Sequence, residues 1–367
     1  MNTTILLFII IVLFIYSIVT LFRAIRTREG FSDTAQNSIG KPTPEYMTVL
    51  AEHQKKGMFP WRWLKNEKGQ LLPIVLVSAF FRDDESRNRY KEYIDNGVKV
   101  VGITAYKTFI KPIYDPSEDT YHHRDDFDYA GLIKNWLVCF KDYREYGFTD
   151  QHNVMDISES DFYDVEPEEK TKVAKKYDII YVCLKDNDFC PKDGWNAINR
   201  NFELAQKCLP IMIKEFGLKV LIIGRVGCGL EELYGRENIE VTDFLPWSTF
   251  QEKLRESRIL FVPNIMDASP RVIAEAMIKG LPVIMNRNIV CGSKYVAPET
   301  GELFNDDTDF GAALSRTLKK YDSISPKAVQ SWWASHYGIN RSAKRLRDFL
   351  VACYPGLVDD SQEVSFF

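Results

Sequence analysis

The amino-acid sequence predicts an α/β protein in which two doubly wound parallel sheets face each other across a cleft. Three observations support this fold class. Apolar runs of strand length alternate with helical segments along most of the chain, which is typical of parallel sheets covered by helices. A charged stretch, 159–176, separates this alternation into two halves. The length of 367 residues suits two domains of ordinary size.

The composition excludes several other classes of protein. Hydrophobic residues make up 45% of the chain and charged residues 27%, which excludes a disordered chain or a collagen-like repeat. The formal net charge of −4 does not suggest a protein that binds nucleic acid by charge, so we expect no nucleic-acid partner. The 7 cysteines form no Cys-x-x-Cys pair, so neither a zinc site nor a disulfide framework is predicted.

The first residues, 1–28, predict a transmembrane anchor with a basic flank. No charged side chain occurs from 2 to 22, and a helix that spans a bilayer needs ~20 such residues. A cleaved signal peptide would carry its basic residues before the apolar run, whereas Arg23, Arg26 and Arg28 follow it. Basic flanks favour the cytoplasmic side. We therefore expect a single-pass membrane protein whose folded part lies in the cytosol.

The range 29–70 is interpreted as a tether, because it is mixed polar and contains three of the prolines, Pro42, Pro44 and Pro60. Its aromatic cluster, Phe59, Trp61 and Trp63, is expected to dock on the folded body, and the alternative is a position at the membrane interface.

The range 71–172 is predicted to be the first domain. Its expected elements are strands at 73–81 and 98–105, a helix at 85–96, a long loop at 114–128 and an amphipathic helix at 130–146.

The range 173–326 is predicted to be the second domain, and 327–367 a C-terminal helix with a tail. A capping box of Ser248 and Gln251 is expected to open one helix of the second domain. Its other helices are expected at 195–216, 230–234, 270–279 and 309–321, and its strands at 178–184, 219–224, 239–244, 258–263 and 281–286. Ligands of such sheets bind at the carboxyl ends of the strands.

The stretch 267–286 carries the most informative pattern. Ser269 is a good N-cap and Pro270 a good first helical residue. The backbone N–H groups of Arg271 and Val272 then remain available to a phosphate at the helix start. Glu275 follows about one and a half turns further along, where a carboxylate can accept both hydroxyls of a ribose. The pattern thus favours a nucleoside diphosphate at this helix.

From Asp267 to Met277, and on through Gly-Leu-Pro-Val-Ile at 280–284, the chain resembles the group 1 (family 4-like) glycosyltransferases of GT-B fold. Their signature is two acids with seven residues between them, and the resemblance covers 177–350. It implies two Rossmann-like domains, an acceptor in the first, a nucleotide-sugar donor in the second, and a C-terminal helix that crosses back. It also implies transfer of a hexose, usually with retention and without a metal or other cofactor. The family usually has Glu where this chain has Asp267, which shortens the reach to the sugar by one methylene.

The resemblance assigns roles to further residues. Lys185 and Lys192 correspond to the basic pair that holds the donor phosphates, and Asp267 to the acid that orients the sugar hydroxyls. His123, or His122 beside it, corresponds to the histidine of the first domain that touches the donor sugar. The candidate catalytic residues are therefore Asp267, Lys192, Lys185 and His123.

Two residues complete the expected donor site. Gly224 lies in a loop near the donor, where a glycine permits close backbone approach. Phe244 lies in the segment that flanks the nucleotide base, where it is as readily a core residue as a stacking partner. The candidate donor-binding residues are therefore Glu275, Ser269, Pro270, Arg271, Val272, Gly224 and Phe244.

The sequence thus predicts a glycosyltransferase that moves a sugar to a glycan, a lipid-linked or a protein acceptor. The alternatives are an inactive scaffold or binding protein, and a phosphorylase or epimerase of the same fold. The glycines at 224, 227 and 229 lack the spacing of a nicotinamide-binding loop, which disfavours a dehydrogenase. The first domain departs from the family, because its first strand is followed by Arg-Asp-Asp-Glu at 82–85 instead of a glycine-rich loop.

Overall fold

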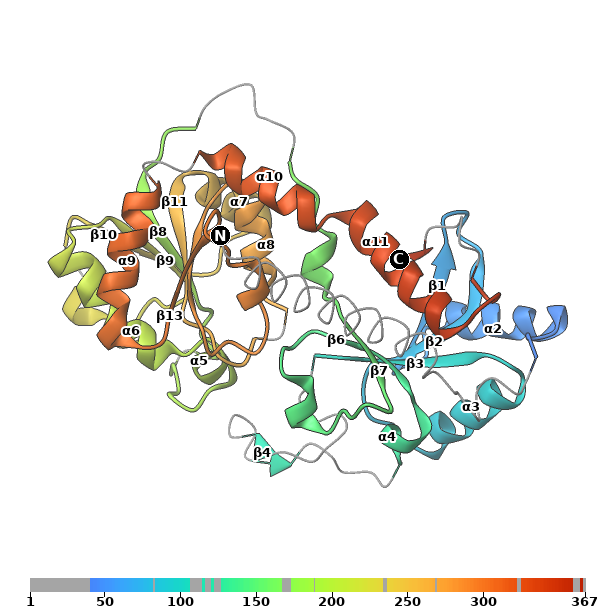
Figure 1. Ribbon diagram of the computed structural model, residues 1–367. Coiled ribbons are helices and arrows are strands. Elements are labelled where there is room, and N and C mark those ends of the chain that lie inside the picture. Colours follow the sequence, from blue (N-terminus) through green and yellow to red (C-terminus); the bar gives the residue numbers. More distant parts are fainter. Residues whose placement is uncertain are drawn as a thin grey trace, which may run out of the picture.

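The structure, a computed structural model, describes residues 40–358 and 364–365, without 82, 106–113, 116–119, 122–126, 167–172, 188, 234–235, 268 and 322–324. Two α/β domains lie beside each other, each built on a six-stranded sheet (Figure 1). The anchor predicted at 1–28 and the histidines His122 and His123 lie outside the described residues. Within the described ranges, no helix combines the length and the apolar character that crossing a membrane requires.

The first sheet has the strand order β14-β1-β2-β3-β6-β7. β2, β3, β6 and β7 are parallel, whereas β1 is antiparallel to both of its neighbours. The carboxyl ends of the parallel strands therefore meet at one edge, and β1 begins at that same edge. The strand bounds are β1 Trp61–Asn66, β2 Leu71–Val77, β3 Lys99–Thr104, β6 Asn135–Val138, β7 Asn153–Asp156 and β14 Val364–Ser365, with a separate pair of β4 Tyr114–Asp115 and β5 Thr120–Tyr121.

Helices cover both faces of the first sheet. α2 and α3 pack on one face, where Leu50 and Tyr93 join the core. α11 covers the other face with Leu346 and Leu350 (Figure 1). The chain thus returns to the first domain through its last helix. The bounds are α2 Pro44–Lys56, α3 Asp84–Asp95, α4 Tyr129–Leu132 and α11 Ile339–Cys353, with 3-10 helices at Tyr143–Tyr146 and Glu159–Phe162.

The predicted tether over 29–70 is wrong where the structure describes it, because residues 44–66 contain α2 and β1. Trp61 and Trp63 are 1% and 8% exposed and belong to the core of the first domain, so this part of the aromatic cluster docks on the folded body. β1 was not recognised because Arg62 and Lys65 interrupt its apolar residues. Alternate residues of a strand point to opposite faces, so charged positions between buried ones are compatible with a sheet.

The predicted helix over 130–146 is also wrong. The chain forms α4, then β6, and then a 3-10 helix within this range. Trp136, Leu137, Val138, Cys139 and Phe140 are all buried. A run of consecutive buried residues belongs to a parallel strand covered on both faces, and it outweighs the helical spacing of the flanking residues.

The second sheet is entirely parallel, with the order β10-β9-β8-β11-β12-β13. β9 and β10 follow β8 on one side of it, and β11, β12 and β13 then follow on its other side. The strand order therefore reverses between β8 and β11, and in doubly wound sheets such a switch point opens a crevice for ligands. The bounds are β8 Tyr177–Val182, β9 Val220–Ile223, β10 Ile239–Thr242, β11 Ser257–Val262, β12 Val283–Asn286 and β13 Gly301–Phe304.

The helices of the second domain differ from prediction at two places. The single helix expected at 195–216 is broken, because Asn201 adopts a left-handed conformation with φ +49°. The capping box of Ser248 and Gln251 does not form, because the N-cap of α7 is Pro246, two residues earlier than Ser248. The bounds are α5 Trp195–Asn199, α6 Phe202–Pro210, a π-helix Ile211–Glu215, a 3-10 helix Glu231–Leu233, α7 Trp247–Arg255, α8 Arg271–Met277, a 3-10 helix Ser293–Tyr295, α9 Asp307–Tyr321 and α10 Pro326–His336.

A buried carboxylate, that of Asp161, connects the two domains. It is 0% exposed, and it accepts hydrogen bonds from the Tyr295 hydroxyl at 2.6 Å and the Lys294 ammonium at 2.9 Å. Lys294 also donates to Asp156 at 2.8 Å. The backbone carbonyl of Asp161 accepts from the N–H of Gly338, which joins α10 to α11, at 2.9 Å. Both segments that pass from one domain to the other are therefore hydrogen-bonded at the same point.

A second contact joins the domains through Lys141. Its N–H donates to the carbonyl of Val290 at 3.1 Å, and its ammonium donates to the carbonyl of Arg287 at 2.8 Å. Val290 and Cys291 also pack against the core of the first domain. The loop after β12 thus rests on the first domain.

Candidate functional site

Most of the predicted site residues lie at the switch point of the second sheet. The loop after β8 carries Lys185 and Lys192, and the loop after β11 carries Asp267 and Ser269. Because β8 and β11 are paired, both loops leave the sheet at adjacent carboxyl ends. Two backbone hydrogen bonds, from Ile265 and Met266 to the carbonyl of Asn199, hold the β11 loop against the end of α5.

Asp267, the predicted first acid, is held by two neighbours. Its carboxylate forms an ion pair with Arg200 and accepts from the side-chain amide of Asn264 at 2.9 Å. The Asp267 side chain is only 11% exposed. Burial lowers the pKa of the Arg200 guanidinium, yet a guanidinium stays charged in this range. The two neighbours therefore fix the orientation of the Asp267 carboxylate, and the charge of Arg200 balances its negative charge.

Arg200 is a site residue that sequence analysis missed. It lies between α5 and α6, in the segment where a continuous helix was expected. The left-handed Asn201 turns the chain here, and this break brings Arg200 to the loop after β11. The two asparagines of the Asn-Arg-Asn triplet at 199–201 were the available signal, because asparagine is a poor residue for a helix interior.

The start of α8 differs from the prediction by one residue. The N-cap position is occupied by Pro270, and Ser269 precedes it without capping the helix. Instead, the Ser269 hydroxyl lies 3.3 Å from the hydroxyl of Ser160 in the first domain. The N–H groups of Arg271 and Val272 donate no hydrogen bond to any residue within the described ranges. The helix start therefore lies at the boundary between the domains.

Glu275, the predicted second acid, is half-buried on α8. Burial raises the pKa of its carboxyl, while Lys279, the nearby indole of Trp247 and Arg271 act in the opposite direction. The pKa of the Tyr163 hydroxyl is raised, mainly by burial and secondly by the negative charge of Glu275. The carboxyl thus lies in a partly apolar setting that still contains cations and donors.

The predicted basic pair is arranged unevenly. Lys185 lies 3.4 Å from Asp243, which connects the loops after β8 and β10. Lys192 is exposed. Between them, Asp186 accepts from the backbone N–H of Asn196 at 2.7 Å and so satisfies the first turn of α5. The amino end of α5 is therefore closed by protein.

Arg225 is a second residue that sequence analysis missed, and it is 0% exposed. Its Nε donates to the Cys183 sulfur at 3.2 Å, its guanidinium carbon lies 4.5 Å from the centre of the Phe202 ring, and Asp186 lies 3.9 Å away. Its two Nη atoms have no hydrogen-bond partner among the residues that the structure describes. A buried guanidinium with unsatisfied donors favours a nearby anion. Its position directly after a strand and Gly224 was the available signal.

Gly224 is required by the backbone. Its φ is +96°, and a Cβ atom would lie 2.7 Å from the carbonyl oxygen of Cys183. The glycine therefore permits the close approach of two chain segments, β8 and β9, at the site edge.

Two aromatic side chains between the end of β10 and the start of α7 are exposed. Phe244 is 72% exposed and Trp247 is 70% exposed. The exposure of Phe244 excludes the core position that its sequence left open. The indole of Trp247 also acts on the carboxyl of Glu275, where it lowers the pKa against the effect of burial.

The loops after β8 and β9 are joined covalently by a disulfide between Cys190 and Cys228. No disulfide was predicted, because the two cysteines are 38 residues apart and show no motif. Within the described ranges, no group of three or more His, Cys, Asp or Glu side chains is arranged to hold a metal ion.

Residues 196–320 match the family described as glycosyl transferases group 1. No curated protein matches the chain. Among solved structures, the chain is similar to sucrose-phosphate synthase of Thermosynechococcus elongatus, with a TM-score of 0.54, 12% identity and coverage of 84% of this chain and 77% of that one. It is also similar to a glycosyltransferase of Rickettsia africae, with a TM-score of 0.51, 13% identity and coverage of 87% and 84%. A third similar structure is the apo form of the lipopolysaccharide outer core galactosyltransferase WaaB, with a TM-score of 0.51, 15% identity and coverage of 76% of this chain and 75% of that one.

At these identities the structural likeness shows the fold, which is the α/β GT-B-like arrangement with parallel sheets. The family match covers α5 to α9 and so includes Asp267 and Glu275. Together, the group 1 domain and the fold support an enzyme of the glycosyltransferase class.

Proposed function

We propose that this enzyme transfers a hexose from a nucleoside-diphosphate sugar to a glycan, a lipid-linked or a protein acceptor, with retention and without a metal. The observation that carries the proposal is the arrangement at the switch point. Lys185 and Arg225 lie in the loops that follow β8 and β9 at this edge, and Glu275 lies on α8, the helix that follows the loop after β11. Arg225 and Glu275 fall inside the segment that matches the group 1 family. Anions and riboses bind at such edges in doubly wound sheets.

In this proposal the diphosphate lies between the loop after β8 and the start of α8. Lys185, Lys192 and Arg225 supply positive charge, and the N–H groups of Arg271 and Val272 at the start of α8 supply donors. Negative charge grows on the diphosphate as the bond to the sugar breaks, so these groups stabilise the transition state more than the bound donor.

Two acids act on the sugars of the donor. Glu275 accepts hydrogen bonds from the ribose hydroxyls, and Asp267 orients the hydroxyls of the transferred hexose. The pairing of Asp267 with Arg200 and Asn264 fixes the carboxylate in one direction, which suits a residue that positions a substrate. His123 is proposed to contact the same hexose from the first domain.

We also propose that residues 1–28 anchor the protein in a membrane with the enzyme on the cytosolic side. Support comes from the uncharged run followed by arginines. An anchor of this kind would keep the enzyme close to a lipid-linked acceptor.

The test is nucleotide binding measured by calorimetry with UDP, GDP and ADP, followed by turnover of the matching nucleotide sugars. Glu275→Gln keeps the size of the side chain and removes its charge, so affinity for the preferred nucleotide should fall about 10- to 100-fold, as for lost charged hydrogen bonds. Glu215→Gln is the matched control, since Glu215 precedes β9 at the opposite edge of the sheet. Equal affinity in the Glu275 and Glu215 variants would contradict the proposal.

A second candidate, a catalytically inactive GT-B protein, is favoured by the ion pair that neutralises Asp267. It predicts nucleotide binding without turnover of any nucleotide sugar. Turnover that depends on Asp267 would exclude it.

A further inference from the structure

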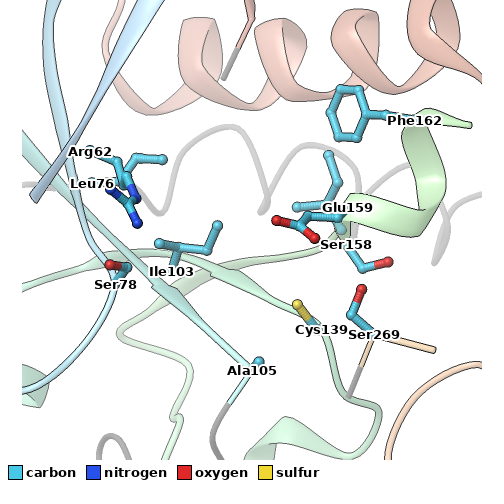
Figure 2. Close-up of a pocket in the computed structure, with 11 residues that line it drawn as sticks. Arg62, Leu76, Ser78, Ile103, Ala105, Cys139, Ser158, Glu159, Phe162 and Ser269 are labelled. Atoms are coloured by element: carbon cyan, nitrogen blue, oxygen red, sulfur yellow. The ribbon is translucent and has the colours of Figure 1, made fainter. Parts of the chain in front are cut away.

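A cavity of about 390 Å³ lies in the first domain, beside the start of α8. Its walls come from the carboxyl edge of the first sheet, where β2, β3, β6 and β7 end, and from Ser269 of the second domain (Figure 2). Ligands of parallel sheets bind at this edge. The lining residues are Arg62, Leu76, Ser78, Ile103, Ala105, Cys139, Ile157, Ser158, Glu159, Phe162 and Ser269.

Arg62 reaches this cavity because of the alternation along β1. Trp61 and Trp63 point into the core on one face of the sheet, so Arg62 between them points to the other face. It is paired across the strands with Leu76, which lines the same cavity. Arg62 forms no ion pair with any residue that the structure describes.

Glu159 enters the cavity from the opposite wall. It is the first residue of the 3-10 helix Glu159–Phe162, directly before Ser160, whose hydroxyl lies 3.3 Å from that of Ser269. Figure 2 shows the guanidinium of Arg62 and the carboxylate of Glu159 extending into the same space. Like Arg62, Glu159 has no ion-pair partner in the described part of the chain.

The rest of the cavity offers few free polar groups. Ser78 donates to the carbonyl of Pro60 at 2.8 Å, and the hydroxyl of Ser158 lies 3.0 Å from that of Tyr295. Leu76, Ile103 and Phe162 form an apolar wall. The two charged side chains are therefore the groups left to recognise a ligand.

We propose that this cavity binds an acceptor sugar that carries an anionic group, a phosphate or a carboxylate, with Arg62 on the anion and Glu159 on a hydroxyl. A guanidinium recognises both anions through paired N–H donors, and a carboxylate accepts hydrogen bonds from hydroxyls. The apolar wall suits the face of a sugar ring. Glu159 lies on the side of Ser269, so the hydroxyl that it holds is the one nearest the proposed donor site.

The role of this sugar as the acceptor rests on the proposed function. The test of the inference measures binding and does not require turnover. The probes are glucose 6-phosphate, glucuronate and neutral glucose, and binding to the full chain is measured by saturation-transfer NMR and calorimetry. We expect at least one anionic sugar to bind roughly tenfold or more tightly than glucose, as a charge-assisted contact predicts. Whichever of the two anionic sugars binds more tightly identifies the anion.

The variants separate the two contacts. Arg62→Gln should abolish the preference for the anionic sugar, and Arg62→Lys should retain part of it. Lys68→Gln, an equal loss of charge at the exposed turn between β1 and β2, is the matched control and should change nothing. Glu159→Gln should weaken the binding of charged and neutral sugars alike. Glu145→Gln, which changes an exposed glutamate, should leave the binding of both unchanged.

Three outcomes would overturn the inference. Glucose binding as tightly as both anionic sugars, a preference that persists in Arg62→Gln, or the same loss in Lys68→Gln would each show that Arg62 does not select the ligand. Thermal melting of each variant shows whether it is folded, and Arg62→Lys provides a conservative variant in case Arg62→Gln is not. If anionic sugars bind through Arg62 while no nucleotide binds, the proposed function fails and the assignment of the cavity stands.

Discussion

Replacement of Asp161 by asparagine is expected to destabilise the protein strongly. The side chain is fully buried and accepts hydrogen bonds from Tyr295 at 2.6 Å and from Lys294 at 2.9 Å. It also accepts from the N–H of Ser158 at 3.2 Å. An asparagine can accept from Tyr295, but its NH₂ group would then face two donors, the Lys294 ammonium and the Ser158 N–H.

The magnitude follows from what remains of the network. Loss of one partner of a buried ion pair costs about 3–5 kcal/mol. Lys294 keeps its hydrogen bond to Asp156 at 2.8 Å, but Asp156 is 42% exposed and compensates only in part. We therefore expect Asp161→Asn to lower the free energy of unfolding by about 3 kcal/mol, the low end of that range.

Urea unfolding measures this change, with Asp348→Asn as the matched control. Asp348 pairs with Lys344 at 2.6 Å but is 51% exposed, and surface ion pairs contribute about 0–1 kcal/mol. The double variant Asp161→Asn, Lys294→Met should be less destabilised than the sum of the single variants by about 1–3 kcal/mol, because the two residues are in contact. A loss in Asp161→Asn no larger than in Asp348→Asn, or additive single variants, would refute the reasoning.

Three further predictions concern the second domain. Burial raises the pKa of Glu275 above its ordinary value of 4.5, so nucleotide affinity that depends on its ionised form should fall as the pH drops through that raised pKa. In Trp247→Leu, which removes a contact that favours the charge, calorimetry across pH should place this fall at higher pH, and an unshifted profile would contradict the reasoning. Gly224→Ala should lower the free energy of unfolding in urea by about 1–3 kcal/mol more than Gly227→Ala does. Both glycines have a positive φ, but of the two only Gly224 has a backbone carbonyl, at 2.7 Å, where the new Cβ would lie. Equal unfolding midpoints for the two variants would exclude this contact as the cause. Cys190→Ser removes the disulfide between two cysteines 38 residues apart, so the free energy of unfolding should fall by about 2–4 kcal/mol relative to the oxidised wild type. The reduced wild type should show a similar loss. Equal stability of the reduced and oxidised wild type would contradict this prediction.

The second domain was largely predictable from sequence. Its strands are buried on both faces and so appear as apolar runs, and the glycines at 217 and 280 mark the ends of helical segments. The order and approximate ranges of five of the six strands in this sheet were therefore correct, whereas the edge strand β13, Gly301–Phe304, was not predicted. The break at Asn201 was missed because the apolar spacing of α5 and α6 continues across it, and only the φ of +49° shows the turn.

The first domain was less predictable. β1 carries Arg62 because one face of this strand meets a cavity, and a charge at that position contradicts the apolar pattern expected of a buried strand. β6 is only four residues long and lies inside a stretch with helical spacing. Contacts between domains, such as that of Asp161 with Lys294, join residues far apart in sequence and have no local pattern.

The positions of Arg200 and Arg225 illustrate the same limit for the site. Both are ordinary loop or helix-end residues in the sequence, yet one pairs with Asp267 and the other is fully buried. Sequence spacing identified the acids because they share a helix and its preceding loop. Arg200 comes from the break between α5 and α6 and Arg225 from the loop after β9, and only the folded structure brings them to the same side of the sheet as the acids.

The hydrogen bonds of Asp161 bring the two covalent connections between the domains to one point. Its carboxylate holds Tyr295 and Lys294 of the second domain, and its carbonyl accepts from Gly338 between α10 and α11. A rotation of one domain against the other must therefore either break these hydrogen bonds or take place about them. We expect the second, because the Asp161 side chain is fully buried.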